Sequence, residues 1–222
     1  MMRELLLLLM VGCLVAPLSA GESKVPLKTK VPEEILAGTP PDVIALLYPG
    51  TVVPKEEDFK LMVPKGTVNL ALKKKVTSSE SRPTIGKLSF VTDGKKEGTD
   101  NNLLELTPDL QWVQIDLGQS ADIYAVYLWH YFREGRSYQD VIVQVSDDPK
   151  FKKDVHTIYN NDTDASAKMG IGRDRPYVET YLGCLIDAKG VRGRYVRLYS
   201  DGNTANGMNH YIEVEVFGKP AK

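Results

Sequence analysis

Apolar and polar side chains alternate along several short segments of this 222-residue chain, from about Asn69 onward. Alternation with a period of two indicates strands that have one buried face and one solvated face. It is clearest in 113–117, 141–146 and 212–217. Turn-forming residues separate such segments, at Asp93-Gly94, Gly118-Gln119, Asp147-Asp148-Pro149, Lys189-Gly190 and Asp201-Gly202-Asn203. Many short strands without helical patterns between them predict an all-β fold, an antiparallel sandwich or barrel.

The first twenty residues have the pattern of a secretory signal peptide. Arg3 precedes the apolar run from Leu5 to Val15, and the small residues Ser19 and Ala20 follow it. This run is too short to span a bilayer, and the rest of the chain has no second run of about 18 apolar residues. We therefore expect a signal peptide at 1–20, no transmembrane segment, and a secreted or periplasmic protein.

A lipoprotein signal with an acylated Cys13 is a less favoured alternative. The apolar stretch from Leu14 to Leu18 would then follow the cut, where a mature lipoprotein is usually polar. Removal of the signal peptide leaves Cys184 as the single cysteine, so no intramolecular disulfide is expected. Because Cys184 lies in an apolar segment, we interpret it as a small core residue.

Residues 21–66 predict an extension and not an independent domain. Proline and glycine recur throughout, which excludes a long helix or a central strand. One short helix is expected from Thr39 as N-cap to Leu47, with Val43, Leu46 and Leu47 on the side that packs against the main domain. The main domain is expected at 67–219.

The charged residues balance almost completely, with 28 Lys and Arg against 29 Asp and Glu. A chain with a net charge of −1 has no long-range field that gathers phosphates. Nucleic acid is therefore not an expected partner.

Six segments follow one another along the chain: 69–79, 91–94, 112–118, 140–148, 194–198 and 212–218. In this order they resemble the discoidin domain, also called the coagulation factor type C domain. The resemblance implies a two-layer jelly-roll β-sandwich of the galactose-binding type, which family 32 carbohydrate-binding modules share. Segments 69–80 and 208–218 are then expected to be neighbours. Eukaryotic members usually join their ends by a disulfide. This chain lacks one and looks more similar to the bacterial carbohydrate-binding branch.

The resemblance also implies a structural calcium ion. The matching ligands are Asp93 and Glu213, with Thr99 or Asp100 and backbone carbonyls nearby. Such a set suits Ca²⁺, which takes about six to eight oxygen ligands. In the alternative interpretation Asp93 only sets a turn and Glu213 is a solvated edge charge. Two neighbouring lysines at 95 and 96 depart from the family pattern and would repel a cation.

Sugar recognition requires aromatic faces for the C–H side of a pyranose and fixed donors for its hydroxyls. Both occur after the apolar segment 123–128, and the ligand candidates there are His130, Tyr131, Phe132, Arg133, Arg136 and Tyr138. The resemblance favours Arg136 over Arg133 as the recognition arginine. In the alternative, Tyr138 packs and Arg136 pairs with Asp140 or Asp116. Trp129 is interpreted as core.

A second polar cluster lies between the last two strands. Asn206, Asn209 and His210 could reach the same end of the sandwich as ligand-binding residues. Asparagine is also common in turns because it tolerates left-handed backbone, and this explanation is favoured for the cluster.

Catalysis has little support in the sequence. The three histidines have no metal-ligand spacing, and neither a G-x-S-x-G elbow nor an H-E-x-x-H pair occurs. We therefore predict a non-catalytic exported module that binds carbohydrate. The alternative is an exported adaptor that binds another protein through the sandwich or the extension. Exposed side chains in the 130–138 loop would favour the first, and their burial under 31–63 the second.

Overall fold

The computed structural model describes residues 22–99 and 101–221. The predicted signal peptide, Cys13 and Asp100 lie outside these ranges. The strands are β1 (Lys24–Pro26), β2 (Met62–Pro64), β3 (Val68–Asn69), β4 (Lys75–Ser78), β5 (Leu104–Leu106), β6 (Gln111–Trp129), β7 (Ile142–Ser146), β8 (His156–Asn160), β9 (Cys184–Ser200), β10 (Asn209–Tyr211) and β11 (Glu213–Pro220). The helices are α1 (Pro41–Leu47) and two 3₁₀ helices, η1 (Glu56–Phe59) and η2 (Leu88–Thr92). None of these helices is long and apolar enough to cross a membrane.

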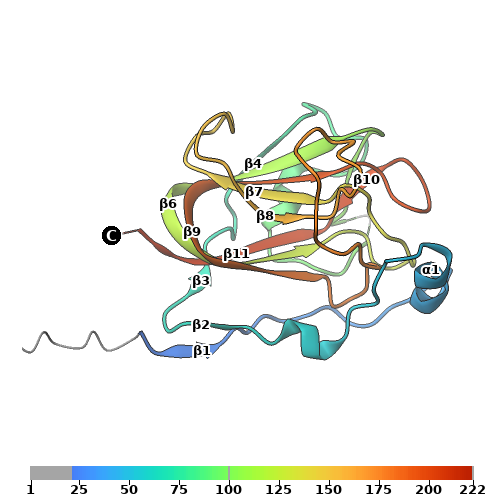
Figure 1. Cartoon of the computed structure of the whole chain (residues 1–222), viewed down its shortest axis with the longest axis horizontal. Coiled ribbons are helices and arrows are strands. Elements are labelled where there is room, and N and C mark those ends of the chain that lie inside the picture. Colours follow the sequence, from blue (N-terminus) through green and yellow to red (C-terminus); the bar gives the residue numbers. More distant parts are fainter. Residues whose placement is uncertain (1–21, 100, 222) are drawn as a thin grey trace, which may run out of the picture.

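Two long strands, β6 and β9, organise the sandwich. They pair antiparallel along most of their length and curve together, so that each strand contributes to both layers (Figure 1). One layer adds β4 beside the first half of β6, with β7 and β8 beyond β9. The other adds β11 beside the second half of β6, with β3 outside it. The prediction of an all-β antiparallel sandwich is confirmed.

The long strands contain two of the predicted turns. Gly118-Gln119 lies inside β6, and Lys189-Gly190 lies inside β9. Pairing between the strands is interrupted at both places, and Gly118 and Gly190 have φ of 90° and 80°. The prediction that these pairs separate strands is wrong, because a left-handed residue marks a bulge or bend in a strand as well as a turn.

The two ends of the main domain lie side by side. Asn69 of β3 pairs with Phe217 of β11, and the side-chain Oδ1 of Asn69 accepts hydrogen bonds from the backbone N–H groups of Ala71 and Val216. The expected neighbourhood of 69–80 and 208–218 is therefore present without a disulfide.

The core lies between the two layers. Alternate residues of β6, such as Val113, Ile115 and Leu117, are buried there together with the inward side chains of β7, β9 and β11. Burial of each such side chain stabilises the fold by about 1.5–3 kcal/mol. Trp129 is also fully buried, in agreement with its interpretation as core.

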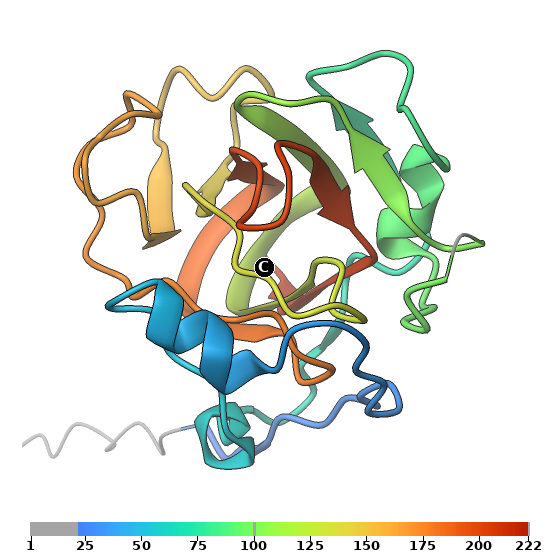
Figure 2. The same ribbon diagram turned by 90° about the vertical axis from the view of Figure 1, so that its right-hand side faces the viewer.

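The segment before β3 docks along the sandwich and has a small sheet of its own. Strands β1 and β2 pair antiparallel, and the chain between them carries α1 to the end of the sandwich where β10 and the long loops lie (Figures 1 and 2). Phe59 of η1 stacks on Tyr127 with ring centroids 5.6 Å apart. The ammonium of Lys96 donates to Thr29 Oγ1 and Lys30 O, both at 2.8 Å.

Helix α1 begins after Pro40, which occupies the N-cap position expected for Thr39. Its buried side chain is Ile44, while Val43, Leu46 and Leu47 are exposed. The expectation that these three pack against the domain is therefore wrong. The physical reason is the docking angle: a helix of seven residues makes about two turns, and only the side with Ile44 meets the sandwich.

Candidate functional site

The loop predicted to bind sugar leaves β6 after Trp129 and is mostly buried. His130, Phe132, Arg136 and Tyr138 are between 0% and 3% exposed. Tyr131 and Arg133 are half-buried. The structure thus brings the predicted residues together but leaves only two of them within reach of solvent.

The N-terminal extension, residues 22–66, is what covers this loop. The backbone N–H of Ala37 donates to Arg133 O at 2.7 Å. A Cβ on Gly135 would lie 2.1 Å from Thr39 O and 3.5 Å from Ile44 Cγ1, so the two backbones are in direct contact. The extension thus lies against 132–135 of the loop, where Phe132 shares an apolar cluster with Val31, while Tyr138 is buried in the core of the sandwich itself.

The buried polar side chains of the loop bond to one another and to neighbouring residues. His130 Nδ1 donates to Glu179 Oε1 at 2.6 Å, and the imidazole stacks on Tyr138 with centroids 4.2 Å apart. Arg136 pairs with Glu134 and lies over the ring of Tyr131. The partners of Arg136 in the alternative interpretation, Asp140 and Asp116, are wrong, because Asp140 bonds Ser166 and Asp116 bonds Arg194.

His210 lies in the same cluster. Tyr138 donates its hydroxyl proton to His210 Nδ1 at 2.8 Å, and His210 Nε2 donates to Glu105 Oε2 at 3.1 Å. Burial, together with the positive charge of Arg136, lowers the pKa of His210 from 6.5 to about 3. The imidazole is therefore neutral in the folded protein at pH 7.

We expect the folded state to lose stability as the pH falls from about 6.5 to about 3. In this window the unfolded chain binds a proton at His210 and the folded protein does not. Each pH unit then costs up to about 1.4 kcal/mol. His210→Gln should flatten this dependence in urea denaturation measured at several pH values. A variant with an unchanged acid slope would contradict the burial of a neutral imidazole.

The two predicted asparagines hold the loop before β11 in shape. Asn209 is buried, and its amide donates to the carbonyls of Thr107 and Asp109, both at 2.9 Å. Asn206 is exposed, and its Oδ1 accepts from Asn203 and from the backbone of Met208. These contacts agree with the turn explanation, and a role in ligand binding stays a prediction.

The predicted metal ligands lie at the start of β11 and in the loop after η2. Glu213 is fully buried: its Oε2 accepts from the Gly94 backbone, while Oε1 has no partner within 22–99 and 101–221. Burial, helped by the charges of Glu215 and Asp93, raises the pKa of Glu213 to about 9. Lys96 is neutralised by Glu215 at 2.8 Å.

These observations fit a hard cation at Glu213. A buried carboxylate oxygen without a donor, near a second carboxylate, is a site at which positive charge is favoured. The hydroxyl of Thr99 bonds Asn102 and keeps lone pairs free. The ligand set of Asp93, Thr99, Asp100 and Glu213 stays a prediction.

A second acidic cluster was not found from the sequence. Asp140, Asp162 and Asp164 have carboxylate oxygens within 4.8 Å of one another. Asp162 is buried and accepts from the backbones of Ser166 and Ala167. The close spacing of acidic residues in 162–164 was the available signal, but only the fold brings Asp140 to them.

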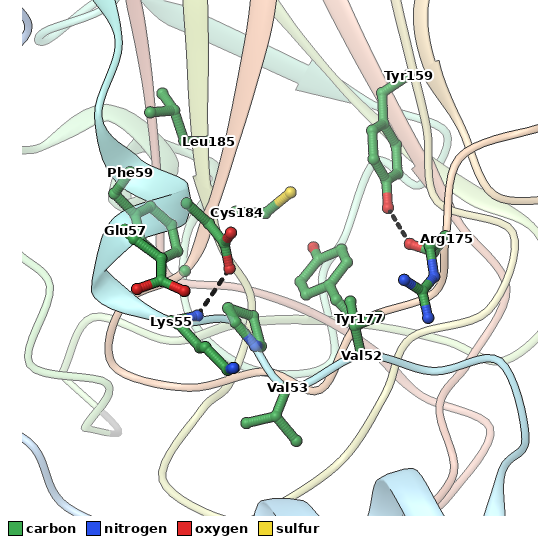
Figure 3. Close-up of a pocket in the computed structure, with 13 residues that line it drawn as sticks. Val52, Val53, Lys55, Glu57, Phe59, Tyr159, Arg175, Tyr177, Cys184 and Leu185 are labelled. Carbon is green, nitrogen blue, oxygen red and sulfur yellow. Dashed lines mark hydrogen bonds between the residues drawn. The ribbon is translucent and has the colours of Figure 1, made fainter.

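A cleft of about 590 Å³ lies between the extension and the sandwich (Figure 3). Extension residues 52–55 and 57–59 form one wall, and the other has Tyr159, Arg175, Tyr177 and 183–185. Its volume is within the range of small-molecule sites, about 300–1,000 Å³. The sequence did not indicate this cleft, because its walls come from segments that are at least 100 residues apart.

Residues 90–178 match the family model of the NedA-like, galactose-binding domain of F5/F8 type C. Among solved structures, the family 89 glycoside hydrolase from Clostridium perfringens is similar over 69% of this chain, with 19% identity and a TM-score of 0.51. This chain spans 15% of that structure.

Two smaller structures match with lower scores. Chitosan-binding module 1 from the chitosanase/glucanase of Paenibacillus sp. IK-5 has 22% identity and a TM-score of 0.45, over 68% of this chain and 99% of that module. A fucose-binding module of Streptococcus pneumoniae has 18% identity and a TM-score of 0.45, over 67% and 96%. No curated protein matches the chain.

Proposed function

We propose that this chain is an exported, non-catalytic module that binds carbohydrate, from the premise that residues 90–178 match a discoidin-like domain of the F5/F8 type C group. The observation that carries the proposal is the match of residues 90–178 to a galactose-binding domain. The matched segment contains the polar loop 130–138 and, in Tyr159, Arg175 and Tyr177, part of the cleft wall. Binding in such a site needs fixed donors and aromatic faces and no reacting group.

Calcium is part of this proposal. Asp93, Thr99, Asp100 and Glu213 would hold Ca²⁺, which would supply positive charge to the buried carboxylate and fix the loop after η2 to the start of β11. The residues themselves position the loop, since Glu213 Oε2 already accepts from the Gly94 backbone. The sugar site would then depend on the ion only through the shape of the fold.

A glycan array tests the proposed function. The exported protein is applied to neutral, amino and acidic saccharides, with calcium and after treatment with a chelator. We expect selective binding to one group of saccharides. The chelator should weaken this binding, because loss of the ion would destabilise the fold. A uniform lack of binding in the presence of calcium would contradict carbohydrate recognition.

A second candidate function is an adaptor, and one observation favours it. The extension covers the predicted sugar loop and leaves Leu46 79% and Leu47 63% exposed on α1. Exposed apolar side chains grouped on one element are typical of protein interfaces. If this face binds another exported protein, the double variant Leu46→Ser, Leu47→Ser should keep its melting temperature and lose that partner in cross-linking. A partner retained by the variant would exclude this face.

A further inference from the structure

We propose that the cleft between the extension and the sandwich is the carbohydrate site, and that it takes a saccharide with a carboxylate on its ring. This inference rests on the proposed function and names its location and substrate class. It differs from the sequence prediction, which placed the sugar at the 130–138 and 206–210 loops.

The two walls of the cleft are fixed to each other by backbone hydrogen bonds. Val52 N–H donates to Pro176 O at 2.9 Å, and Val178 N–H donates to Val52 O at 2.8 Å. On the sandwich side, the hydroxyl of Tyr159 donates to Arg175 O at 2.9 Å. A site held in this way loses little conformational entropy when a ligand binds. The extension is therefore a structural part of the site and not only a tether.

The surfaces inside the cleft suit a pyranose ring. Phe59, Tyr159 and Tyr177 contribute aromatic carbon, and Val52, Pro54 and Leu185 contribute aliphatic carbon. The C–H face of a sugar packs against such rings. Figure 3 shows the rings of Tyr159 and Tyr177 on one side of the cleft and Phe59 on the other. A ring between them would contact both the sandwich and the extension.

Two cations line the cleft and indicate the charge of the ligand. Arg175 and Lys55 are exposed, and within the described residues no side-chain hydrogen bond or ion pair engages either. A guanidinium binds a carboxylate through two parallel hydrogen bonds, which gives orientation as well as affinity. A carboxylate on the sugar would give Arg175 the side-chain partner that it lacks among the described residues.

Two acidic residues also line the cleft, and they should affect the binding of an anionic ligand differently. Asp58 Oδ2 accepts from the Lys55 backbone at 2.8 Å and shapes η1. Glu57 is exposed and has no such partner among the described residues. An unpaired carboxylate at the rim repels an anionic ligand, so its removal should strengthen binding while removal of Arg175 weakens it.

The test uses two ligands that differ at one carbon: oligosaccharides of galacturonic acid, and galactose oligomers of the same length and linkage. Calorimetry with the full exported chain should give at least about tenfold tighter binding for the acid. Arg175→Gln should remove that advantage, so that the affinity for the acid falls at least about tenfold, towards that for galactose. Glu57→Gln should tighten binding of the acid.

Arg173→Gln is the matched control, because Arg173 is exposed two residues away and does not line the cleft. Its affinity for the acid should equal that of the unchanged protein, and all variants should melt at the same temperature. Equal affinity for the two ligands, or full affinity in Arg175→Gln, would overturn the inference. If neutral sugars bind and no cleft variant changes their affinity, the inference about the cleft is overturned, but the proposed carbohydrate binding is not. No binding of any saccharide would overturn the proposed function itself.

Discussion

In the absence of calcium, we expect the protein to lose stability as the pH rises from about 4.5 to about 9. The cause is Glu213, whose pKa is raised from 4.5 to about 9 by burial and by neighbouring negative charge. The folded state keeps the proton while the unfolded chain has released it, so this contribution is complete below pH 4.5 and is lost as the pH rises through 9. The slope is up to about 1.4 kcal/mol per pH unit, a large share of a typical stability of about 5–15 kcal/mol.

Glu213→Gln should remove this alkaline loss, because a neutral amide can still accept from Gly94 and has no proton to release. Calcium should stabilise the unchanged protein most at high pH, where the ion replaces the proton, and should not stabilise the variant. Urea denaturation at pH 6.5, 7.5 and 8.5 measures both effects. Glu97→Gln is the matched control, since Glu97 is exposed in the same loop region. A calcium response retained by Glu213→Gln would exclude Glu213 as a ligand.

Gly135→Ala should separate the extension from the loop that it covers. The new Cβ would lie 2.1 Å from Thr39 O, a distance that the two backbones can relieve only by moving apart. We expect a destabilisation of about 1–3 kcal/mol and rapid proteolysis near α1. Gly207→Ala is the control, because its Cβ meets only the ring of Pro108, at 3.3 Å.

The Gly135→Ala variant also distinguishes the two proposed locations of the sugar site, the cleft and the 130–138 loop. If the cleft binds the ligand, displacement of the extension weakens binding. If the 130–138 loop binds it, uncovering His130 and Arg136 strengthens binding. An extension that stays resistant to protease in Gly135→Ala would show that the contact with Thr39 does not hold it in place.

The alternation predicted three strands, at 113–117, 141–146 and 212–217, because a two-residue period does not depend on distant contacts. The solvated face that it implied is wrong for β7, which is buried throughout, and for most of β11, where Thr29 and Lys96 contact Glu215. It predicted the neighbourhood of β3 and β11 through the family resemblance. It did not predict that β6 runs from 111 to 129 without a turn. The Gly118-Gln119 signal is the same for a bend within one strand as for a turn between two strands.

The site was harder to predict, because burial of the polar loop depends on the docked position of residues 37–44. Ala37 and Gly135 carry no sequence signal for this contact, since it uses their backbones and the absence of a side chain at 135. The exposure of Val43, Leu46 and Leu47 likewise depends on the angle at which α1 docks. Residues that line the cleft, such as Phe59 and Arg175, belong to no recognisable sequence motif. They indicate a binding site only after the fold brings them together.

The most direct test of the account is a titration of the full chain with oligomers of galacturonic acid, followed residue by residue by NMR. The account predicts shift changes on both walls of one cleft, at Val52 to Phe59 and at Tyr159 to Leu185, and none at Asn206 or Arg133. Changes confined to the 130–138 and 206–210 loops would contradict it.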